Sequence, residues 1–263
     1  MILDDIVEAT RQRVESLKQK ESLESVKARA LEIVRNEKRK EVTFYSQLRK
    51  PGLHMICEVK KASPSKGVIT SEFDYMAIAK EYEEIGASCI SVLTEPAFFQ
   101  GDNAYLAEIK QEVSIPVLRK DFIIEEYQIY EAKTLHADCI LLITAILNQE
   151  QLEEYITLSE TLHMNALVEA HDEEEIRRAL KAGATIIGVN NRNLRDFTVN
   201  IETSIDLRKQ VPKEVVFIAE SGIKTAKDIL RLYQNDVNGV LIGETFMRSS
   251  GKGKVIADLT SLL

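Results

Sequence analysis

The sequence predicts an α/β protein, a (β/α)8 TIM barrel with an N-terminal helical extension. Short runs rich in Ile, Val, Leu and Cys recur eight times after residue 50, and their starts are about 26 residues apart. Amphipathic helical patterns lie between these runs, and such alternation is typical of βαβ units in a parallel sheet. The length of 263 residues also suits one barrel of this kind.

The predicted strands follow one another along the chain at 54–60, 88–94, 115–119, 138–144, 165–169, 184–189, 215–220 and 238–242. The clearest helical patterns between them cover 74–85, 125–135, 149–162 and 172–182. A weak repeat precedes several strands: Gly86, His136 and Gly183 are each followed by Ala and then by the next strand. We expect each to end a helix with positive φ, and Asn238 begins a looser copy.

Residues 1–50 lie outside the eightfold pattern. They contain two helical stretches, at 3–17 and 22–38, and a charged run at 36–41 that we expect to be solvated. We interpret residues 1–50 as an extension packed on the barrel, so that 1–263 form a single domain. A further hypothesis places one or more apolar residues of the extension over the mouth of an active site.

Composition excludes several functional classes. The net charge of −8 argues against nonspecific nucleic-acid binding, although a cleft can still attract a small anionic substrate. The N-terminus lacks a basic segment followed by an apolar one, so we expect no secretory signal. The longest apolar run, 139–147, is too short to cross a bilayer as a helix. We therefore expect a cytoplasmic protein with no membrane partner.

The cysteines and histidines show no pattern of a metal or thiol site. Each of the three cysteines lies inside a strand-like run, and no Cys-x-x-Cys pair occurs. We interpret them as buried, reduced side chains rather than as nucleophiles. The four histidines lack metal-ligand spacing, and we expect core or surface roles for them and no bound metal. The residues concerned are Cys57, Cys89, Cys139, His54, His136, His163 and His171.

Polar side chains mark the ends of five predicted strands. Side chains two residues apart share one face of a strand, so each polar residue continues the face of an apolar one before it. In a barrel this face can be the interior, and the carboxyl ends of the strands are where active sites lie. The residues on that face are Glu58 and Lys60, Lys120, Glu169, Asn190, and Glu220.

This set of amines, carboxylates and an amide suits proton transfer. Buried opposite charges are unfavourable unless they pair or take part in chemistry. A Lys as general acid and a Glu as general base are one interpretation, because neighbours and burial tune their pKa values. A purely structural ion network at the rim of the barrel is the alternative.

Two further groups of residues suggest substrate contacts. The loops after the seventh and eighth strands contain Ser221-Gly222 and Gly243-Glu244, and in barrels these loops often bind phosphate. Ordinary turns have similar residues, so the prediction depends on both loops together. Additional donors would come from Lys60, Ser63 and Arg192, while Phe99 and Phe122 either wall an aromatic pocket or pack locally.

Seven motifs in one order carry a resemblance to the indole-3-glycerol-phosphate synthase family, from about residue 1 to the C-terminus. They lie at 58–65 (EVKKASPS), 92–95 with 98–101, 118–122 (LRKDF), 167–169, 188–194, 219–223 and 241–244. The resemblance implies a lyase of tryptophan biosynthesis that needs no metal or cofactor. It implies ring closure, decarboxylation and dehydration of 1-(2-carboxyphenylamino)-1-deoxyribulose 5-phosphate to indole-3-glycerol phosphate.

The resemblance also implies a role for each matching residue. Lys120 would be the general acid, Lys60 would hold the departing carboxylate, and Glu169 would assist dehydration. Glu58 and Glu220 would orient the lysines, and Asn190 would assist positioning. Phosphate would bind to Ser63, Arg192, Ser221, Gly222 and Gly243. Glu244 stands where a small hydroxyl residue suits phosphate better, so we expect its carboxylate to point away and its N–H to remain as donor.

Two alternative functions remain open from sequence. One is another phosphate-binding barrel enzyme, such as phosphoribosylanthranilate isomerase, whose usual acid–base pair of Asp or Cys fits these residues poorly. The other is a non-catalytic barrel that binds a ligand. The oligomeric state is also open, with a monomer as one candidate.

Overall fold

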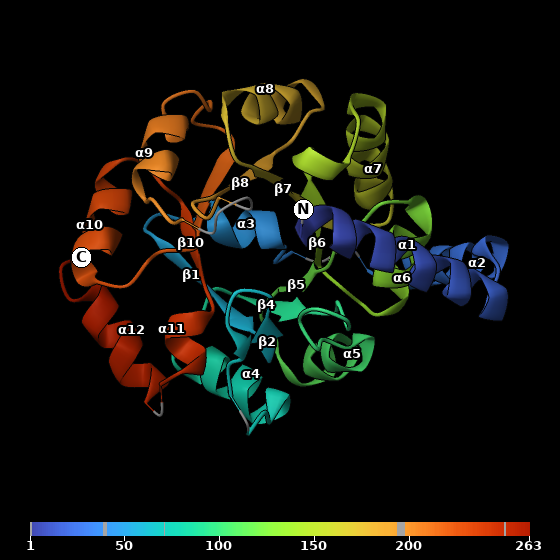
Figure 1. The fold of residues 1–263 in the computed structure, drawn as a ribbon, viewed down its shortest axis with the longest axis horizontal. Coiled ribbons are helices and arrows are strands. Elements are labelled where there is room, and N and C mark those ends of the chain that lie inside the picture. The colour runs from blue at the N-terminus through green and yellow to red at the C-terminus, as the bar shows by residue number, and fades with distance from the viewer. Residues whose placement is uncertain (1, 39–40, 71, 194–197, 250) are drawn as a thin grey trace.

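A computed structural model describes residues 2–38, 41–70, 72–193, 198–249 and 251–263 (Figure 1). Leu194 of the fifth motif and residues 39–40 of the charged run lie outside this part of the chain. Eight parallel strands form a closed barrel in the order β1-β10-β9-β8-β7-β6-β5-β4, which confirms the predicted fold. Their bounds are β1 (His54–Val59), β4 (Cys89–Leu93), β5 (Val117–Lys120), β6 (Cys139–Ile143), β7 (Asn165–Ala170), β8 (Ile186–Asn190), β9 (Val216–Glu220) and β10 (Gly239–Ile242).

Helices surround the barrel. The four helices predicted from periodicity are present within a residue or two as α4 (Tyr75–Glu84), α6 (Glu126–Thr134), α7 (Gln149–Thr161) and α8 (Glu173–Lys181). Side chains such as Asp74, Asn148 and Asp172 accept hydrogen bonds from first-turn N–H groups and so begin these helices. The remaining outer elements are α5 (Asn103–Glu112), η1 (Thr144–Ile146), α9 (Glu202–Arg208), α10 (Ala226–Gln234), α11 (Glu244–Met247) and α12 (Lys252–Thr260).

Left-handed residues end several helices before the next strand, as predicted. Gly86, His136 and Gly183 have φ of 88°, 62° and 86°. In the looser fourth copy the equivalent residue is Asp236, with φ of 58°, and not Asn238. The fourth copy of the repeat therefore begins at Asp236, two residues before the Asn238 at which the sequence motif placed its start.

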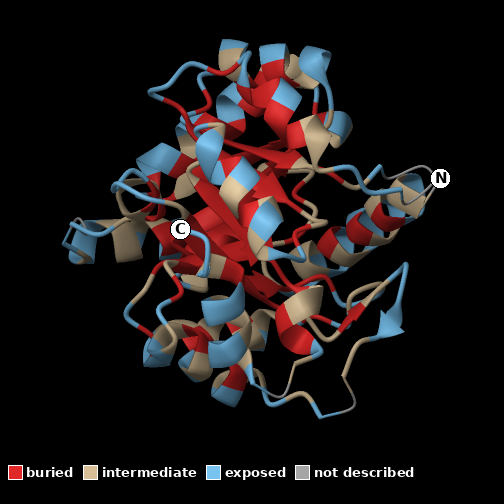
Figure 2. Ribbon diagram, turned by 90° about the vertical axis from the view of Figure 1, so that its left-hand side faces the viewer, coloured by how far each residue is buried: buried red, intermediate tan, exposed pale blue. Residues whose placement is uncertain are grey.

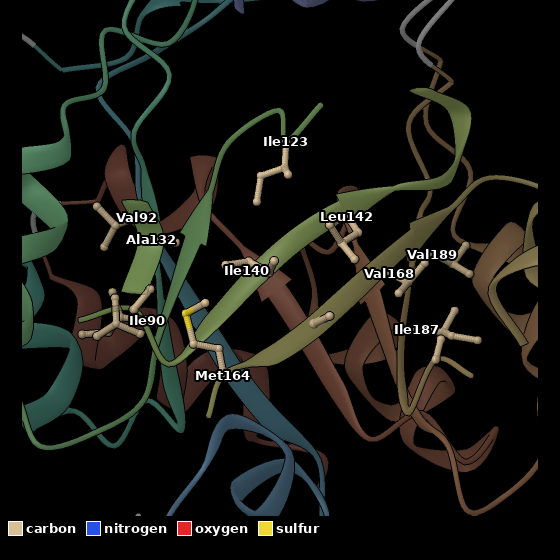
Figure 3. Packing of buried hydrophobic residues seen from close by; sticks show 14 of the residues in the cluster. Ile90, Val92, Ile123, Ala132, Ile140, Leu142, Met164, Val168, Ile187 and Val189 are labelled. Carbon is tan, nitrogen blue, oxygen red and sulfur yellow. The ribbon is translucent and has the colours of Figure 1, made fainter. Parts of the chain in front are cut away.

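Strand residues alternate between two apolar clusters. One set faces the barrel interior and includes Ile56, Leu118, Leu167 and Ile218. The other set faces the surrounding helices, as Figure 3 shows for Val92, Ile140, Leu142, Val168, Ile187 and Val189 among others. Buried residues accordingly concentrate in the strands and on the inner faces of the helices (Figure 2). All three cysteines are buried and free of disulfides.

The N-terminal extension contains α1 (Ile2–Lys20), α2 (Leu23–Asn36) and α3 (Phe44–Leu48). The first two helices were predicted, and α2 packs on α6. The third was not predicted. It lies across the centre of the barrel in Figure 1, and its Phe44 and Leu48 are fully buried in the interior cluster. Since the Tyr45 N–H donates to Asn165 at the start of β7, α3 closes the amino-terminal end of the barrel.

Two other features complete the fold. The segment after β1 contains a small antiparallel hairpin, β2 (Ala62–Ser63) with β3 (Gly67–Val68), that is not among the predicted strands. None of the helices in the described part of the chain is long and apolar enough to cross a membrane.

Candidate active site

A cavity of about 580 Å³ opens where the barrel strands end. Residues from all eight strands line it, together with residues that follow β1, β4, β5, β8, β9 and β10. The structure brings every predicted site residue to this one cavity: Glu58, Lys60, Ser63, Phe99, Lys120, Phe122, Glu169, Asn190, Arg192, Glu220, Ser221, Gly222, Gly243 and Glu244.

Lys120, the last residue of β5, lies between two carboxylates. Its Nζ donates to Glu220 Oε2 at 2.5 Å and to Glu169 Oε2 at 3.2 Å. These carboxylates come from β9 and β7, so the closed barrel joins residues 100 and 49 positions away in sequence. Only 14% of the Lys120 side chain is exposed, and the exposure of both glutamates is below 5%. Such a dry, charge-paired amine can act as a positioned proton donor.

A second amine lies at the end of β1. Lys60 forms an ion pair with Glu58, two residues before it on the same strand face. Gly243 packs directly against this pair, because a Cβ at that position would come within 2.4 Å of Glu58 Oε1. Gly188 has the same relation to Glu220, at 2.3 Å from Oε1. Both glycines are therefore required where carboxylates fill the space beside the backbone.

Glu169 is held through both of its oxygens. Lys120 donates to Oε2, while the side-chain amide of Asn190 donates to Oε1 at 3.3 Å. The Asn190 Oδ1 accepts the backbone N–H of Arg192 at 3.1 Å, which fixes the orientation of the amide. The end of β8 therefore positions the carboxylate at the end of β7.

The pKa values of Glu169 and Glu220 are shifted in opposite directions. Burial opposes the charge on Lys120, but attraction to Glu220, Glu169 and Glu58 outweighs it and raises the pKa of Lys120. Burial raises the pKa of Glu220 to about 7, and neighbouring Glu169 adds to this effect while Lys120 opposes it. For Glu169, burial is outweighed by Lys120, His171 and hydrogen bonds, so its pKa is lowered. Two carboxylates that share one amine thus differ in protonation, as acid–base sites require.

Apolar groups form another part of the wall. The rings of Phe99 and Phe122 lie 5.9 Å apart between centroids, and both face the cavity. The buried Glu95 accepts hydrogen bonds from the N–H groups of residues 97–99 and so holds the loop that carries Phe99. Ile2, Leu3 and Ile6 of α1 also line the cavity, in agreement with the hypothesis that the extension covers its mouth.

The predicted phosphate loops meet at the cavity. Ser221 and Gly222 have φ of 66° and 82°, a left-handed turn that is unusual for the serine. The Glu244 carboxylate accepts from Arg248 Nε at 3.0 Å, and both residues line the cavity. The polar lining residues that were not predicted include Lys66, Lys224, Thr245 and Arg248.

His171 is a further neighbour of the cluster that sequence reasoning did not assign. Its Nε2 lies 3.4 Å from Glu169 Oε1. The sequence contains a signal for this position, because His171 lies two residues after Glu169 and so continues its strand face. Within the described residues, no group of three or more His, Cys, Asp or Glu side chains has a metal-binding arrangement.

A family model described as "Indole-3-glycerol phosphate synthase" matches residues 3–259. The chain belongs to the indole-3-glycerol phosphate synthase family. Curated relatives of that name include one from Lachnoclostridium phytofermentans, 52% identical over 271 residues and covering all of both chains. Another, from Endomicrobium trichonymphae, is 54% identical and covers 98% of this chain and 99% of the relative.

Family membership confirms the resemblance drawn from the seven motifs, and the matched range includes the N-terminal extension as well as the barrel. A solved structure of thiamine phosphate pyrophosphorylase from Pyrococcus furiosus has a TM-score of 0.58 and covers 80% of this chain and 94% of its own. Its identity of 17% supports the shared fold alone.

Proposed function

We propose that this chain converts 1-(2-carboxyphenylamino)-1-deoxyribulose 5-phosphate into indole-3-glycerol phosphate, carbon dioxide and water. The observation that carries the proposal is Lys120, an amine held between Glu169 and Glu220 in a cavity that also has aromatic and anion-binding lining. A cavity of about 580 Å³ is of the size that small ligands occupy. The barrel therefore offers one pocket for both the aryl ring and the phosphorylated chain.

The first step is attack of the substituted ring carbon on the carbonyl carbon of the ribulose chain. Negative charge develops on the carbonyl oxygen as the new carbon–carbon bond forms. Lys120 donates a proton to that oxygen, and its fixed position in a water-poor site makes the donor effective. Glu220 and Glu169 keep the amine protonated before the reaction.

The later steps remove carbon dioxide and water. Lys60, paired with Glu58, holds the substrate carboxylate until its carbon–carbon bond breaks and the electrons restore aromaticity. Glu169, whose lowered pKa keeps it ionised, accepts the proton from the carbon next to the nitrogen, and the electrons of that C–H bond form the ring double bond. The hydroxyl formed from the carbonyl takes a proton from Lys60 and departs as water. Asn190 positions Glu169 for this transfer.

Binding of the distant phosphate supplies orientation. Ser63 and Arg192 contribute side-chain donors, and the N–H groups around Gly222 and Gly243 approach the anion closely. Phe99 and Phe122 contact the aryl ring. Binding energy realised away from the reacting carbons reduces the entropic cost of ring closure. Because the full set of residues lines one chain's cavity, we propose that a monomer suffices.

The decisive assay follows the fluorescence of indole-3-glycerol phosphate when purified protein is mixed with the substrate. We expect first-order growth of indole fluorescence and equal release of carbon dioxide. If the protein instead isomerised phosphoribosylanthranilate and formed no indole product, the alternative isomerase function would replace this one. Binding of the substrate without turnover would favour a non-catalytic barrel.

Lys120→Met tests the role of the proposed general acid. We expect a loss of turnover of at least about 10²–10⁴-fold, the usual contribution of a positioned acid, with the barrel still folded by circular dichroism. Lys110→Met is the matched control, because Lys110 is 13% exposed and pairs with Asp138 at 2.7 Å outside the cavity. A near-normal rate in Lys120→Met would show that another group protonates the carbonyl.

A further inference from the structure

His171 lies immediately after β7 and is held by the first turn of α8. Its backbone N–H and its Nδ1 both contact Glu175 Oε2, at 2.8 and 3.0 Å. Its Nε2 is buried, makes no hydrogen bond of good geometry with any described residue, and lies 3.4 Å from Oε1 of Glu169. The ring therefore bridges two carboxylates, one on α8 and one in the proposed active site.

The protonation of the ring follows from these contacts. An ionised carboxylate only accepts hydrogen bonds, so Nδ1 carries the proton that faces Glu175. In a neutral ring, Nε2 would then carry a lone pair 3.4 Å from the negatively charged Glu169 oxygen, which is unfavourable. In the imidazolium ion, Nε2 carries a proton and positive charge at the same distance, which is attractive. The geometry thus favours the charged ring whenever Glu169 is ionised.

The surrounding charges agree with this conclusion. The titratable groups that face His171 are Glu169 on β7, Glu175 on α8 and, at longer range, Glu220 on β9. Lys120 is connected to the ring through Glu169, to which its Nζ donates. Burial favours the neutral ring, but the hydrogen bond to Glu175 and attraction to Glu169 outweigh it, so the pKa of His171 is raised above 6.5.

We propose that His171, as a cation, is a positioning residue that keeps Glu169 ionised and aimed at the substrate during dehydration. This inference rests on the proposed function. Glu169 would then be held from three sides, with Asn190 and His171 on Oε1 and Lys120 on Oε2. Loss of the His171 proton replaces an attractive contact with a repulsive one, so the contribution of Glu169 declines as the pH rises above the pKa of His171.

His171→Gln removes the charge and retains an amide of similar reach. We expect kcat to fall about 10-fold at pH 7, less than for loss of an acid or base itself, with KM within about twofold. We also expect the alkaline decline of kcat that belongs to His171 to disappear. Glu175→Gln removes the carboxylate that supports the charged ring, so we expect that decline to move to lower pH while kcat on the acid side is kept.

His163→Gln is the matched control, because His163 Nδ1 also lies 3.4 Å from a carboxylate, that of Glu37, and His163 does not line the cavity. We expect it to leave kcat and its pH profile unchanged. An unaltered pH profile in His171→Gln, or equal losses of kcat at every pH in His171→Gln and Glu175→Gln, would overturn the proposal by showing a structural role only.

Proton NMR of the His171 ring gives a readout that needs no turnover. We expect a pKa above 6.5 that decreases in Glu169→Gln, and an unchanged value in that variant would contradict the proposed pair. If this linkage is present but wild-type protein forms no indole product, the proposed function fails and the pair stands. If wild-type protein turns over normally and His171 titrates independently of Glu169, only the present inference fails.

Discussion

We expect Glu220→Gln to lower the turnover and to raise the stability of the protein at neutral and alkaline pH. Glu220 is 2% exposed, its Oε2 accepts from Lys120, and its Oε1 has no hydrogen-bond partner in the part of the chain that the structure describes. Burial, assisted by Glu169, raises its pKa to about 7 from an ordinary value of 4.5. The folded protein therefore holds a proton that the unfolded chain releases at lower pH. Stability is lost as the pH rises from 4.5 through 7, and glutamine, which does not ionise, avoids that loss.

The size of the effect follows from the two pKa values. The pKa of Glu220 is about 2.5 units higher in the folded protein (about 7) than its ordinary value of 4.5, and each unit corresponds to about 1.4 kcal/mol. Above pH 7, Glu220→Gln should therefore increase the free energy of unfolding by about 3 kcal/mol. For a chain of this size that is about 6–12 °C in melting temperature. The glutamine oxygen still accepts from Lys120, and Glu169 and Glu58 still balance its charge. Turnover should nevertheless fall at least about 100-fold, because the acid is no longer correctly held.

Calorimetric melting temperatures at pH 5 and pH 8 measure this directly. We expect wild type and Glu220→Gln to differ little at pH 5 and by about 6–12 °C at pH 8, with the variant higher. Glu131→Gln provides a contrast, since Glu131 is largely buried against Arg119 outside the cavity and its loss should lower the melting temperature at both pH values. A stability difference between wild type and Glu220→Gln that does not change with pH would refute the reasoning.

Two further substitutions test packing at opposite ends of the barrel. Gly243→Ala places a Cβ 2.4 Å from Glu58 Oε1, so we expect kcat/KM to fall about 100-fold with little change in melting temperature. Gly251→Ala is the control, because a Cβ at that position has no other described atom within 4 Å, and we expect its kcat/KM to be unchanged. Leu48→Ala empties a fully buried site in the interior cluster, so urea unfolding should show a loss of about 2–5 kcal/mol. The kcat of folded Leu48→Ala should equal that of wild type, and a large loss of kcat would show that α3 acts on the active site.

The local rules of strands account for much of what sequence predicted. Leu118 and Lys120 share a face because strand side chains alternate, and the structure places Leu118 in the interior cluster directly below Lys120. The same rule puts Glu169 above Leu167 and Glu220 above Ile218. The alternation of side chains between the two faces of a strand is a local property, so it can be predicted without knowledge of the rest of the fold.

Contacts between residues that only the closed barrel brings together could not be predicted from such local rules. The sequence around Lys120 does not indicate that its amine donates to Glu220, 100 residues later, rather than to Glu58. The helix α3 has five residues, too few for a helical period to be recognised, and its position depends on distant strands such as the one that begins at Asn165. Arg119, fully buried, points the other way from Lys120 into a network with Asp121 that no sequence pattern singled out.

The charges of the cluster explain why Glu220 is the carboxylate with the raised pKa. Glu58, Glu169 and Glu220 have two lysines, Lys60 and Lys120, as ion-pair partners at the strand ends, so the three carboxylates are supported unequally. Lys60 is taken by Glu58, while Glu169 gains support from an amide and an imidazole ring. Among the described residues, Glu220 has Lys120 as its hydrogen-bond donor, and its Oε1 accepts no hydrogen bond. A proton near neutral pH is therefore retained most readily at Glu220, and the unequal support of the carboxylates produces that difference.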